Sequence, residues 1–235
     1  MPAVLIIALV LVARVAALSW RAVQASKRAD FIRSFVLPQG LFDKLRATHP
    51  QLSLKDCQLV AQALRQFFLA KLKSGTQTVK QTVAMPSQVA DDLWHEFILC
   101  TRHYDAFCRG AFGRFLHHTP AAAMGGERRS NEGPRRCWWH CYRTENINPS
   151  QPLRLPLLFA IDTKLAIAGG FRYAPDCGPL SAKAGDGGTV IHCGADFGDA
   201  SVDGCIDGFG DGGSDGGGDG GVGGGGGGGG DGCGS

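Results

Sequence analysis

The sequence lacks the short motifs that mark the commonest nucleotide-binding and hydrolytic sites. It has no G-x-x-x-x-G-K-S/T phosphate loop and no G-x-S-x-G nucleophile turn. His95-Glu96 begins an H-E-x-x-H zinc motif, but Leu99 stands where the second histidine would be. No DNA-recognition helix or RNA-binding sheet motif is present either, so we expect no nucleic-acid partner. Motifs of these classes therefore assign no reaction.

Basic residues are absent from the end of the chain, because the last one is Lys183. Residues 1–183 contain all 24 basic and 12 acidic residues, so their formal charge is +12. Residues 184–235 contain nine aspartates and no glutamate, which gives them −9 and the whole chain +3. An acidic tail on a basic body predicts that the tail contacts a protein partner or folds back on the body.

Composition limits the fold class. The chain has 235 residues, 44% of them hydrophobic and 19% charged, which is enough for one domain with a real core. It excludes a wholly disordered chain, a multi-span membrane protein and a collagen-like fibre. Residues 194–235 hold 22 glycines and eight aspartates, and such a segment has too little apolar surface to offset its ordering entropy. We therefore expect a disordered Gly/Asp-rich tail over residues 184–235.

The N-terminus carries the longest apolar run. Residues 3–20 are interrupted only by Arg14, and 18 helical residues can cross a bilayer if that arginine reaches the headgroups. No basic residue precedes the run, as one would in a secretory signal peptide. Four basic residues follow it: Arg21, Lys27, Arg28 and Arg33. We expect residues 1–20 to be a single-pass membrane anchor with the body in the cytoplasm. The alternative is a signal that is cleaved to leave an exported body.

The body, residues 21–183, reads as a small helical bundle. Apolar residues at three- and four-residue steps predict helices over residues 41–48, 53–75, 86–108 and 157–168. Ser53 and Asp56 suit the start of the second helix. A short strand or turn is expected at residues 171–173, and a polar linker within about residues 120–136. The predicted fold class is mainly α.

One set of polar side chains in this body is typical of a site. Asp91 and His95 are four residues apart on a predicted helix, so the carboxylate can reach the imidazole across one turn. With His118 they could hold Zn²⁺ or Fe²⁺, or His95 could serve as a general base. The plainer interpretation is a hydrogen-bonded His–Asp pair that joins the helix to its neighbour. Spacing leaves His117 open as the alternative to His118, whereas His103 is about 12 Å along the helix from His95.

The nine cysteines offer a second set. Cys137-x-x-His140-Cys141 has ligand types, and Cys177 with Cys193 could complete a zinc site, but the gaps match no standard spacing. Free or loosely packed thiols are the competing interpretation. Three further cysteines lie at apolar positions of predicted helices, where packing is expected: Cys57, Cys100 and Cys108.

Several of these residues also form a pattern, D-x-x-W-H followed by Y, C and G-x-x-L-x-H. Its members are Asp91, Trp94, His95, Tyr104, Cys108, Gly113, Leu116 and His118. This pattern, a later block at residues 153–173 and the glycine-rich end resemble the glycine-rich domain-containing proteins of bacteria and plants. Many of those proteins carry a second histidine where this chain has Phe97. The resemblance implies an architecture but no particular reaction.

Two hypotheses follow for function. The first, which the sequence favours, is a non-catalytic, membrane-tethered interaction protein in which the acidic tail contacts a basic partner. The second is a metal-dependent enzyme or sensor that uses Asp91, His95 and His118 with Zn or Fe. Convergence of these three side chains in one pocket is the observation that would favour the second.

Overall fold

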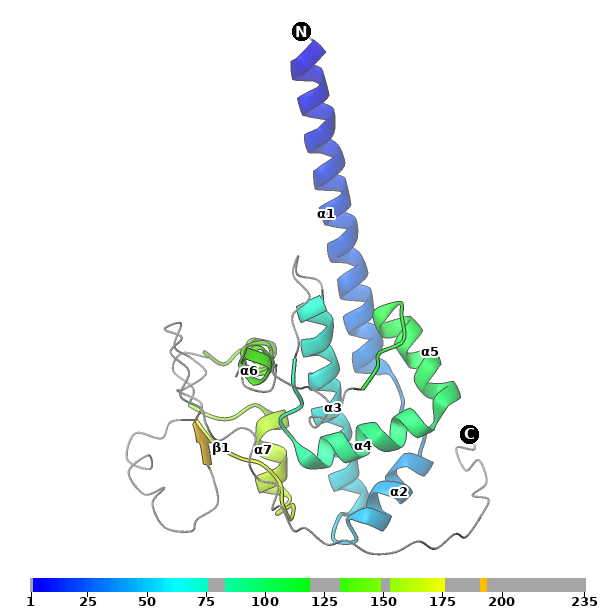
Figure 1. Ribbon diagram of the computed structural model, residues 1–235, viewed down its shortest axis with the longest axis vertical. Helices are drawn as coiled ribbons and strands as arrows, with labels where there is room; N and C mark the ends of the chain where they lie inside the picture. Colours follow the sequence, from blue (N-terminus) through cyan, green and yellow to red (C-terminus); the bar gives the residue numbers. More distant parts are fainter. Residues whose placement is uncertain (1, 76–82, 119–131, 149–152, 176–190, 194–235) are drawn as a thin grey trace, which may run out of the picture.

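The computed structural model describes residues 2–75, 83–118, 132–148, 153–175 and 191–193. Seven helices and two short strands lie in these segments, which confirms the mainly α fold expected from the sequence. A long helix stands out from the body at one end, and six shorter helices form the body (Figure 1). The expected disorder of residues 194–235 and of most of the linker falls outside the described residues.

Helix α1 (Pro2–Ser34) runs through the predicted boundary at residue 20 as a single helix of 33 residues. Nine large apolar side chains between Val4 and Leu18 are each between 48% and 71% exposed, whereas Ile32 is fully buried. Residues 6–34 are long and apolar enough to cross a membrane, a test that a signal sequence also passes. The apolar half therefore lies outside the fold, and the other end of the same helix is part of the core.

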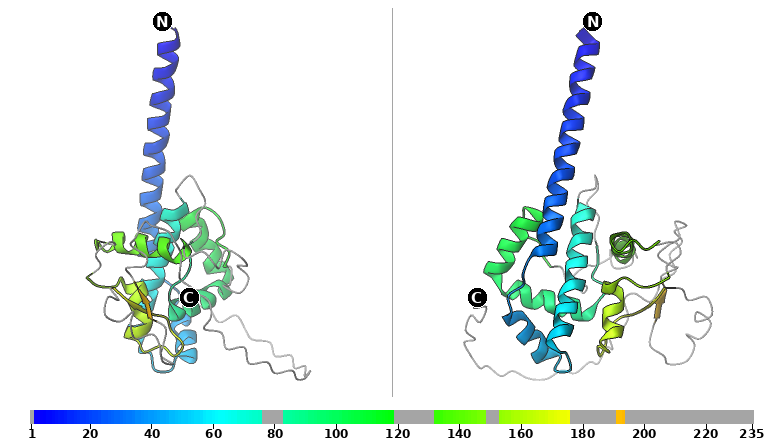
Figure 2. Two further views of the ribbon diagram at one scale, coloured as in Figure 1. Left: turned by 60° about the vertical axis from the view of Figure 1, so that its left-hand side comes forward. Right: turned by 180° about the vertical axis from the view of Figure 1, so that it is seen from behind.

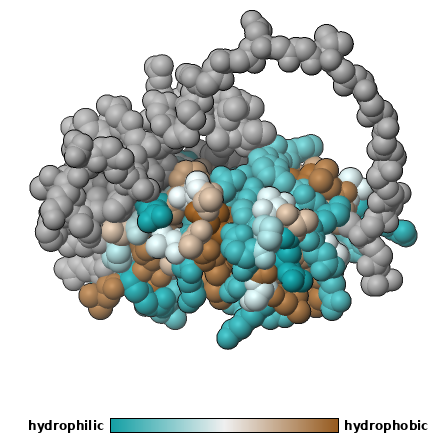
Figure 3. Space-filling model, turned by 90° about the horizontal axis from the view of Figure 1, so that it is seen from below, coloured by the Kyte–Doolittle hydropathy of each residue, from teal (hydrophilic) through white to brown (hydrophobic). Residues whose placement is uncertain are grey.

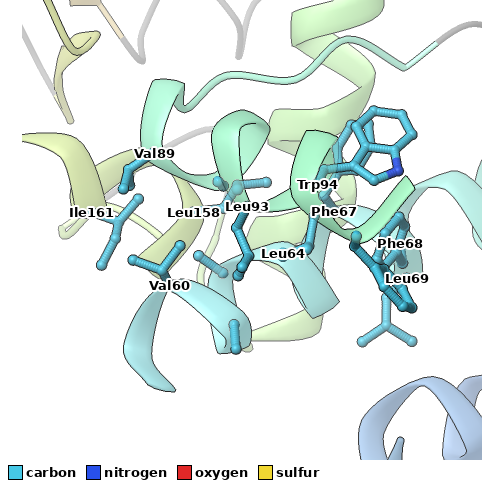
Figure 4. Packing of buried hydrophobic residues seen from close by; sticks show 14 of the residues in the cluster. Val60, Leu64, Phe67, Phe68, Leu69, Val89, Leu93, Trp94, Leu158 and Ile161 are labelled. Atoms are coloured by element: carbon cyan, nitrogen blue, oxygen red, sulfur yellow. The ribbon is translucent and has the colours of Figure 1, made fainter. Parts of the chain in front are cut away.

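Helix α3 (Leu54–Gly75) is the centre of the body. It contacts α1, α2 (Gly40–Thr48), α4 (Gln88–Leu99), α6 (Glu132–Thr144) and α7 (Leu157–Lys164). Apolar residues of α3, α4 and α7 meet in the core, as Figure 4 shows for Leu64, Leu93 and Leu158. The apolar residues that recur at three- and four-residue steps along α3 are buried as expected, because α3 has neighbours on several sides.

The helix predicted over residues 86–108 is two helices, α4 and α5 (Thr101–Phe112), and here the sequence-based expectation is wrong. Cys100 leaves the helical region with φ −78° and ψ 59°, and its N–H is shared between the carbonyls of Glu96 and Phe97. The break lets α4 pack on α2, α3 and α7 while α5 packs against α1. No proline or glycine marks it in the sequence, so the break follows from tertiary packing.

The end of the described chain differs from expectation in two places. Residues 132–136, assigned above to the linker, form the start of α6, where Pro134 is tolerated in the first turn. Residues 191–193, assigned to the tail, form strand β2 (Ile191–Cys193), which pairs in parallel with β1 (Arg172–Ala174). The register aligns Tyr173 with His192 and Ala174 with Cys193.

Candidate metal centre on helix α4

Three side chains named from the sequence meet at the surface of α4. His118 Nε2 lies 3.1 Å from Asp91 Oδ1, and His95 Nδ1 lies 3.7 Å from Asp91 Oδ2. One ligand atom from each of the three residues falls within 4.8 Å of those of the other two. The side chains of Asp91 and His118 are 25% and 13% exposed, and that of His95 is 48% exposed. The cluster is therefore partly embedded in the protein and open to solvent on the His95 side.

The two imidazoles also face each other. The rings of His95 and His118 have centroids 4.3 Å apart with an interplanar angle of 65°, and the ring of Trp94 lies 4.5 Å from that of His118. Trp94 is 3% exposed, so it forms a fixed wall behind His118. His117, the alternative left open by spacing, is exposed, and its ring packs on Phe115 instead. The structure thus places His118 in the cluster.

A buried hydrogen-bond chain holds the segment that carries His118. Trp94 Nε1 donates to the hydroxyl of Tyr104 (3.1 Å), which donates to the backbone carbonyl of Leu116 (2.6 Å). Tyr104 is fully buried, and burial raises the pKa of its hydroxyl, so the group stays a donor. Gly113 ends α5 with φ 70°, which turns the chain back towards α4. Residues that carried the family pattern therefore surround the cluster.

The start of α4 is held by a buried aspartate that sequence analysis did not single out. Asp162 accepts hydrogen bonds at Oδ1 from the Ser87 hydroxyl (2.7 Å) and the Val89 N–H (3.3 Å). Its Oδ2 accepts from the N–H groups of Gln88 (2.7 Å) and Phe171 (3.0 Å). A carboxylate at a helix N-terminus satisfies donors that the helix leaves unpaired and suits the helix dipole. Burial raises the pKa of Asp162, and these hydrogen bonds act in the opposite direction.

A second His–Asp pair lies next to the cluster. His49 Nε2 is 2.8 Å from Asp92 Oδ2, and the Gln88 side chain donates to Asp92 Oδ1 (2.9 Å). This pair joins the end of α2 to α4, and it gives Asp92, the neighbour of Asp91, a histidine partner of its own. The two neighbouring carboxylates consequently have separate partners. No sequence pattern indicated His49, because its partner lies 43 residues away.

The cysteine set predicted as a second metal site is only partly described. Cys137 and Cys141 are fully buried on α6 with their Sγ atoms 4.0 Å apart, and both are free thiols. The hydrogen bond between Cys141 and Cys137 raises the pKa of Cys141 most, and burial raises it further. His140 is 8% exposed, and burial lowers its pKa. Cys177 lies outside the described residues, so zinc binding by this set stays a prediction.

Three further cysteines lie in the part of the chain that the structure describes, and they are of two kinds. Cys57 and Cys108 are buried free thiols in the core, as expected. Cys100 is also buried, but it is disulfide-bonded, which was not expected from its position on the apolar face.

Comparison with known proteins gives one match. A protein-family model described as UCP032817-like matches residues 27–197 of the chain. The matched segment contains the whole candidate centre and begins within the packed half of α1. No curated protein and no solved structure matches the chain significantly.

Proposed function

The chain belongs to the UCP032817-like family, and we propose that it is a membrane-anchored protein whose helical body binds one divalent metal ion, Zn²⁺ or Fe²⁺. The observation that carries the proposal is the convergence of Asp91, His95 and His118 from two turns of α4 and a separate segment. The three side chains converge at a partly exposed surface of α4, and this convergence distinguishes the cluster from an isolated His–Asp pair. It therefore favours the metal hypothesis over the non-catalytic one.

The spacing of the ligand atoms suits a small cation. Zinc bonds of about 2.0–2.1 Å in tetrahedral geometry put neighbouring ligand atoms about 3.3 Å apart. Asp91 Oδ1 lies 3.1 Å from His118 Nε2 and Asp91 Oδ2 lies 3.7 Å from His95 Nδ1, so each carboxylate oxygen is near this spacing from one imidazole. One ligand atom from each residue lies within 4.8 Å of the other two, so binding one ion would draw the three atoms closer together.

The donor set limits the chemistry. Two imidazoles and one carboxylate are the protein ligands of many non-haem Fe²⁺ sites, and three protein ligands with an open position are typical of catalytic Zn²⁺. Asp91 would neutralise part of the ion's charge, and the exposed side of His95 leaves room for water or a substrate. Trp94 and Tyr104 would hold His118 in place from behind. A bound ion would supply Lewis-acid activation of such a water.

Elemental analysis of the full chain in detergent tests the metal site. The protein is loaded with Zn²⁺ or, without oxygen, Fe²⁺, and is then dialysed against metal-free buffer. We expect about one ion per chain in the wild type and loss of that ion in His95→Ala and His118→Ala. His117→Ala is the matched control, because it removes the exposed neighbouring imidazole, and should keep the ion. Equal metal content in all four proteins, with normal circular dichroism, would overturn the proposal.

The membrane part of the proposal rests on α1. A row of exposed apolar side chains over residues 4–18 is much larger than the patches that soluble monomers leave in water. Alkaline extraction of cell membranes should leave the full chain in the pellet, whereas a peripheral or cleaved form would appear in the supernatant.

Two observations bear on which side of the membrane the body occupies, and they make opposite predictions. The basic residues after the apolar run favour a cytoplasmic body. The disulfide at Cys100 favours the exported alternative, because disulfides persist mainly in oxidising compartments. We propose the cytoplasmic orientation, and protease digestion of intact cells tests it: protection of the body supports it, and cleavage from outside contradicts it.

A second candidate function is partner binding through the acidic tail. The observation in its favour is the charge difference between residues 1–183 and 184–235, +12 against −9. Under this hypothesis the protein is a non-catalytic relative of the glycine-rich domain-containing proteins, and Asp91–His95 is a structural pair. Loss of a co-purifying basic partner on deletion of residues 184–235, with no metal in the wild type, would support it.

A further inference from the structure

The end of the body that faces the apolar half of α1 is surrounded by basic side chains. Helix α3 ends on this side, as does α5, and α6 crosses the body near it (Figures 1 and 2). Close contacts show that the C-terminal end of α5 lies beside residues 28–31 of α1. An added Cβ at Gly113 would lie 2.8 Å from the Arg28 guanidinium, and one at Gly110 would meet the ring of Phe31. We define the basic collar as Arg21, Lys27, Arg28, Lys73, Arg114 and Arg143.

Like charges are held together within this end of the body. Lys73 is near both Arg33 and Arg143. Burial lowers the pKa of its amine most, and these two cations lower it further. Its amine donates to the neutral hydroxyl of Thr144 (2.8 Å). Arg143 lies over the ring of Trp139, which is 43% exposed. Mutual repulsion of cations is relieved by an anion, so this surface is suited to a negatively charged partner.

The largest group of acidic residues in the described helices lies on α4, whereas Asp30 of α1 lies beside the collar and pairs with Arg33 (2.8 Å). Helix α4 contains Asp91, Asp92 and Glu96 and no basic residue, and it lies farther from the apolar half of α1 than the ends of α3 and α5 (Figure 1). The face turned away from α1 mixes hydrophilic residues with small apolar patches (Figure 3). The acidic group on α4 is thus remote from the apolar half of α1, whereas the ends of α3 and α5 lie nearer to it (Figure 1).

The helical rise places the collar near a bilayer. If the span ends at Trp20, Arg28 follows after about 12 Å of helix. The headgroup region takes up about 5–8 Å of that distance, and lysine and arginine side chains reach several ångströms further. The potential of an anionic leaflet extends over about 8 Å at physiological salt. The collar therefore falls within reach of the headgroups.

We propose that the basic collar docks on the anionic headgroups of the membrane that contains α1 and holds the body against the bilayer. The inference rests on the membrane-anchor part of the proposed function. A lipid surface fits better than a soluble acidic partner because three collar residues follow the apolar half on α1 itself and the end of α5 packs beside Arg28, where the headgroups are already present. Each basic residue near an anionic surface contributes about fivefold to the docking equilibrium.

Hydrogen exchange of the full chain in lipid nanodiscs tests this docking. We compare discs of phosphatidylcholine with discs that contain about one third phosphatidylserine. The backbone at the C-terminal ends of α3 and α5 should exchange at least threefold more slowly in the anionic discs, and high salt should abolish the difference. The variant Lys27→Gln/Arg114→Gln/Arg143→Gln removes three exposed collar charges and should lose it too. Its control, Lys55→Gln/Arg102→Gln/Lys164→Gln, removes three exposed charges outside the collar and should retain it.

Each other outcome has a defined meaning. If the chain stays in both kinds of disc without lipid-dependent protection, the docking proposal is wrong and the anchor stands. If the chain does not enter discs at all, the anchor itself is refuted. Protection that is equal in both discs and disappears on deletion of residues 184–235 would show that the acidic tail covers the collar, which also overturns the proposal.

Discussion

Replacement of Asp162 tests how strongly the body fixes the helix that carries the candidate metal ligands. The carboxylate is 3% exposed and accepts four hydrogen bonds, three of them from backbone N–H groups. In Asp162→Asn, the amide nitrogen can take the place of Oδ1, because the Ser87 hydroxyl can turn to accept from it. Only the long bond from Val89 is then lost, and one unpaired buried donor costs about 1–3 kcal/mol.

Asp162→Ala removes every acceptor. The N–H groups of Gln88, Val89 and Phe171 lose their partner, and at about 1–3 kcal/mol each the expected loss is about 5 kcal/mol. We therefore expect losses of about 2 kcal/mol for asparagine and about 5 kcal/mol for alanine. In a domain of this size these losses lower Tm by about 4–8 °C and about 10–20 °C.

Thermal unfolding of the full chain in detergent, followed by circular dichroism, measures both variants. Asp56→Asn is the matched control, since Asp56 accepts from the Ser53 hydroxyl and N–H at a helix start but is exposed. Its loss should stay within about 1 kcal/mol. An alanine variant within 2 °C of wild type, or an asparagine variant less stable than alanine, would refute the reasoning.

The pH dependence of the same variants has a definite sign. The folded-state pKa of Asp162 is raised, so the native state binds its proton more strongly than the unfolded state. Wild-type stability from this group is therefore full below the ordinary aspartate pKa and decreases as pH rises through the folded-state pKa. Asparagine does not titrate, so the advantage of wild type over Asp162→Asn should shrink as pH rises from about 3 to 7. A growing advantage would contradict this sign.

Three further predictions concern the surroundings of the site. Tyr104→Phe leaves both hydrogen-bond partners of the hydroxyl unpaired, so it should cost about 2 kcal/mol in thermal unfolding and lower the metal retained after dialysis. Unchanged metal retention would show that the hydrogen bonds from Trp94 through Tyr104 to Leu116 do not position His118. Gly113→Ala and Gly169→Ala both force alanine to φ 70°, and the only close contact among the described residues is with the flexible end of Arg28 at Gly113, so both should lower Tm by similar amounts; a loss at Gly113 alone would contradict this reasoning. Iodoacetamide at pH 8 should modify the buried free thiols of Cys57, Cys108, Cys137 and Cys141 only after denaturation. Rapid labelling of the native protein, measured by mass spectrometry, would refute their burial.

Local patterns were sufficient to predict the helices that are continuous in the sequence. The capping residues Ser53 and Asp56 and the apolar stripe that follows placed α3 correctly, because its buried faces repeat at helical spacing. The break at Cys100 could not be predicted in this way. The apolar positions continue across it, and the direction of α5 depends on contacts with α1, about 70 residues earlier in the chain.

The site shows the same division between local and distant information. Asp91 and His95 were predictable because one turn of helix separates them. The choice of His118 over His117 depended on the Tyr104 hydrogen bond to Leu116, which no spacing rule indicates. Asp162 was missed because it lies in an apolar run and its partners on α4 are 73 to 75 residues away in sequence.

The continuity of α1 has a mechanical consequence. Since no joint separates the apolar half from the half that packs on α3 and α5, the body cannot swivel independently of the span. Transmembrane helices tilt by about 20° on average, and such a tilt moves a point about 40 Å along the helix sideways by about 14 Å. If α1 spans the bilayer as proposed, a change in bilayer thickness that changes its tilt would therefore move the whole body sideways, together with the candidate ligands on α4.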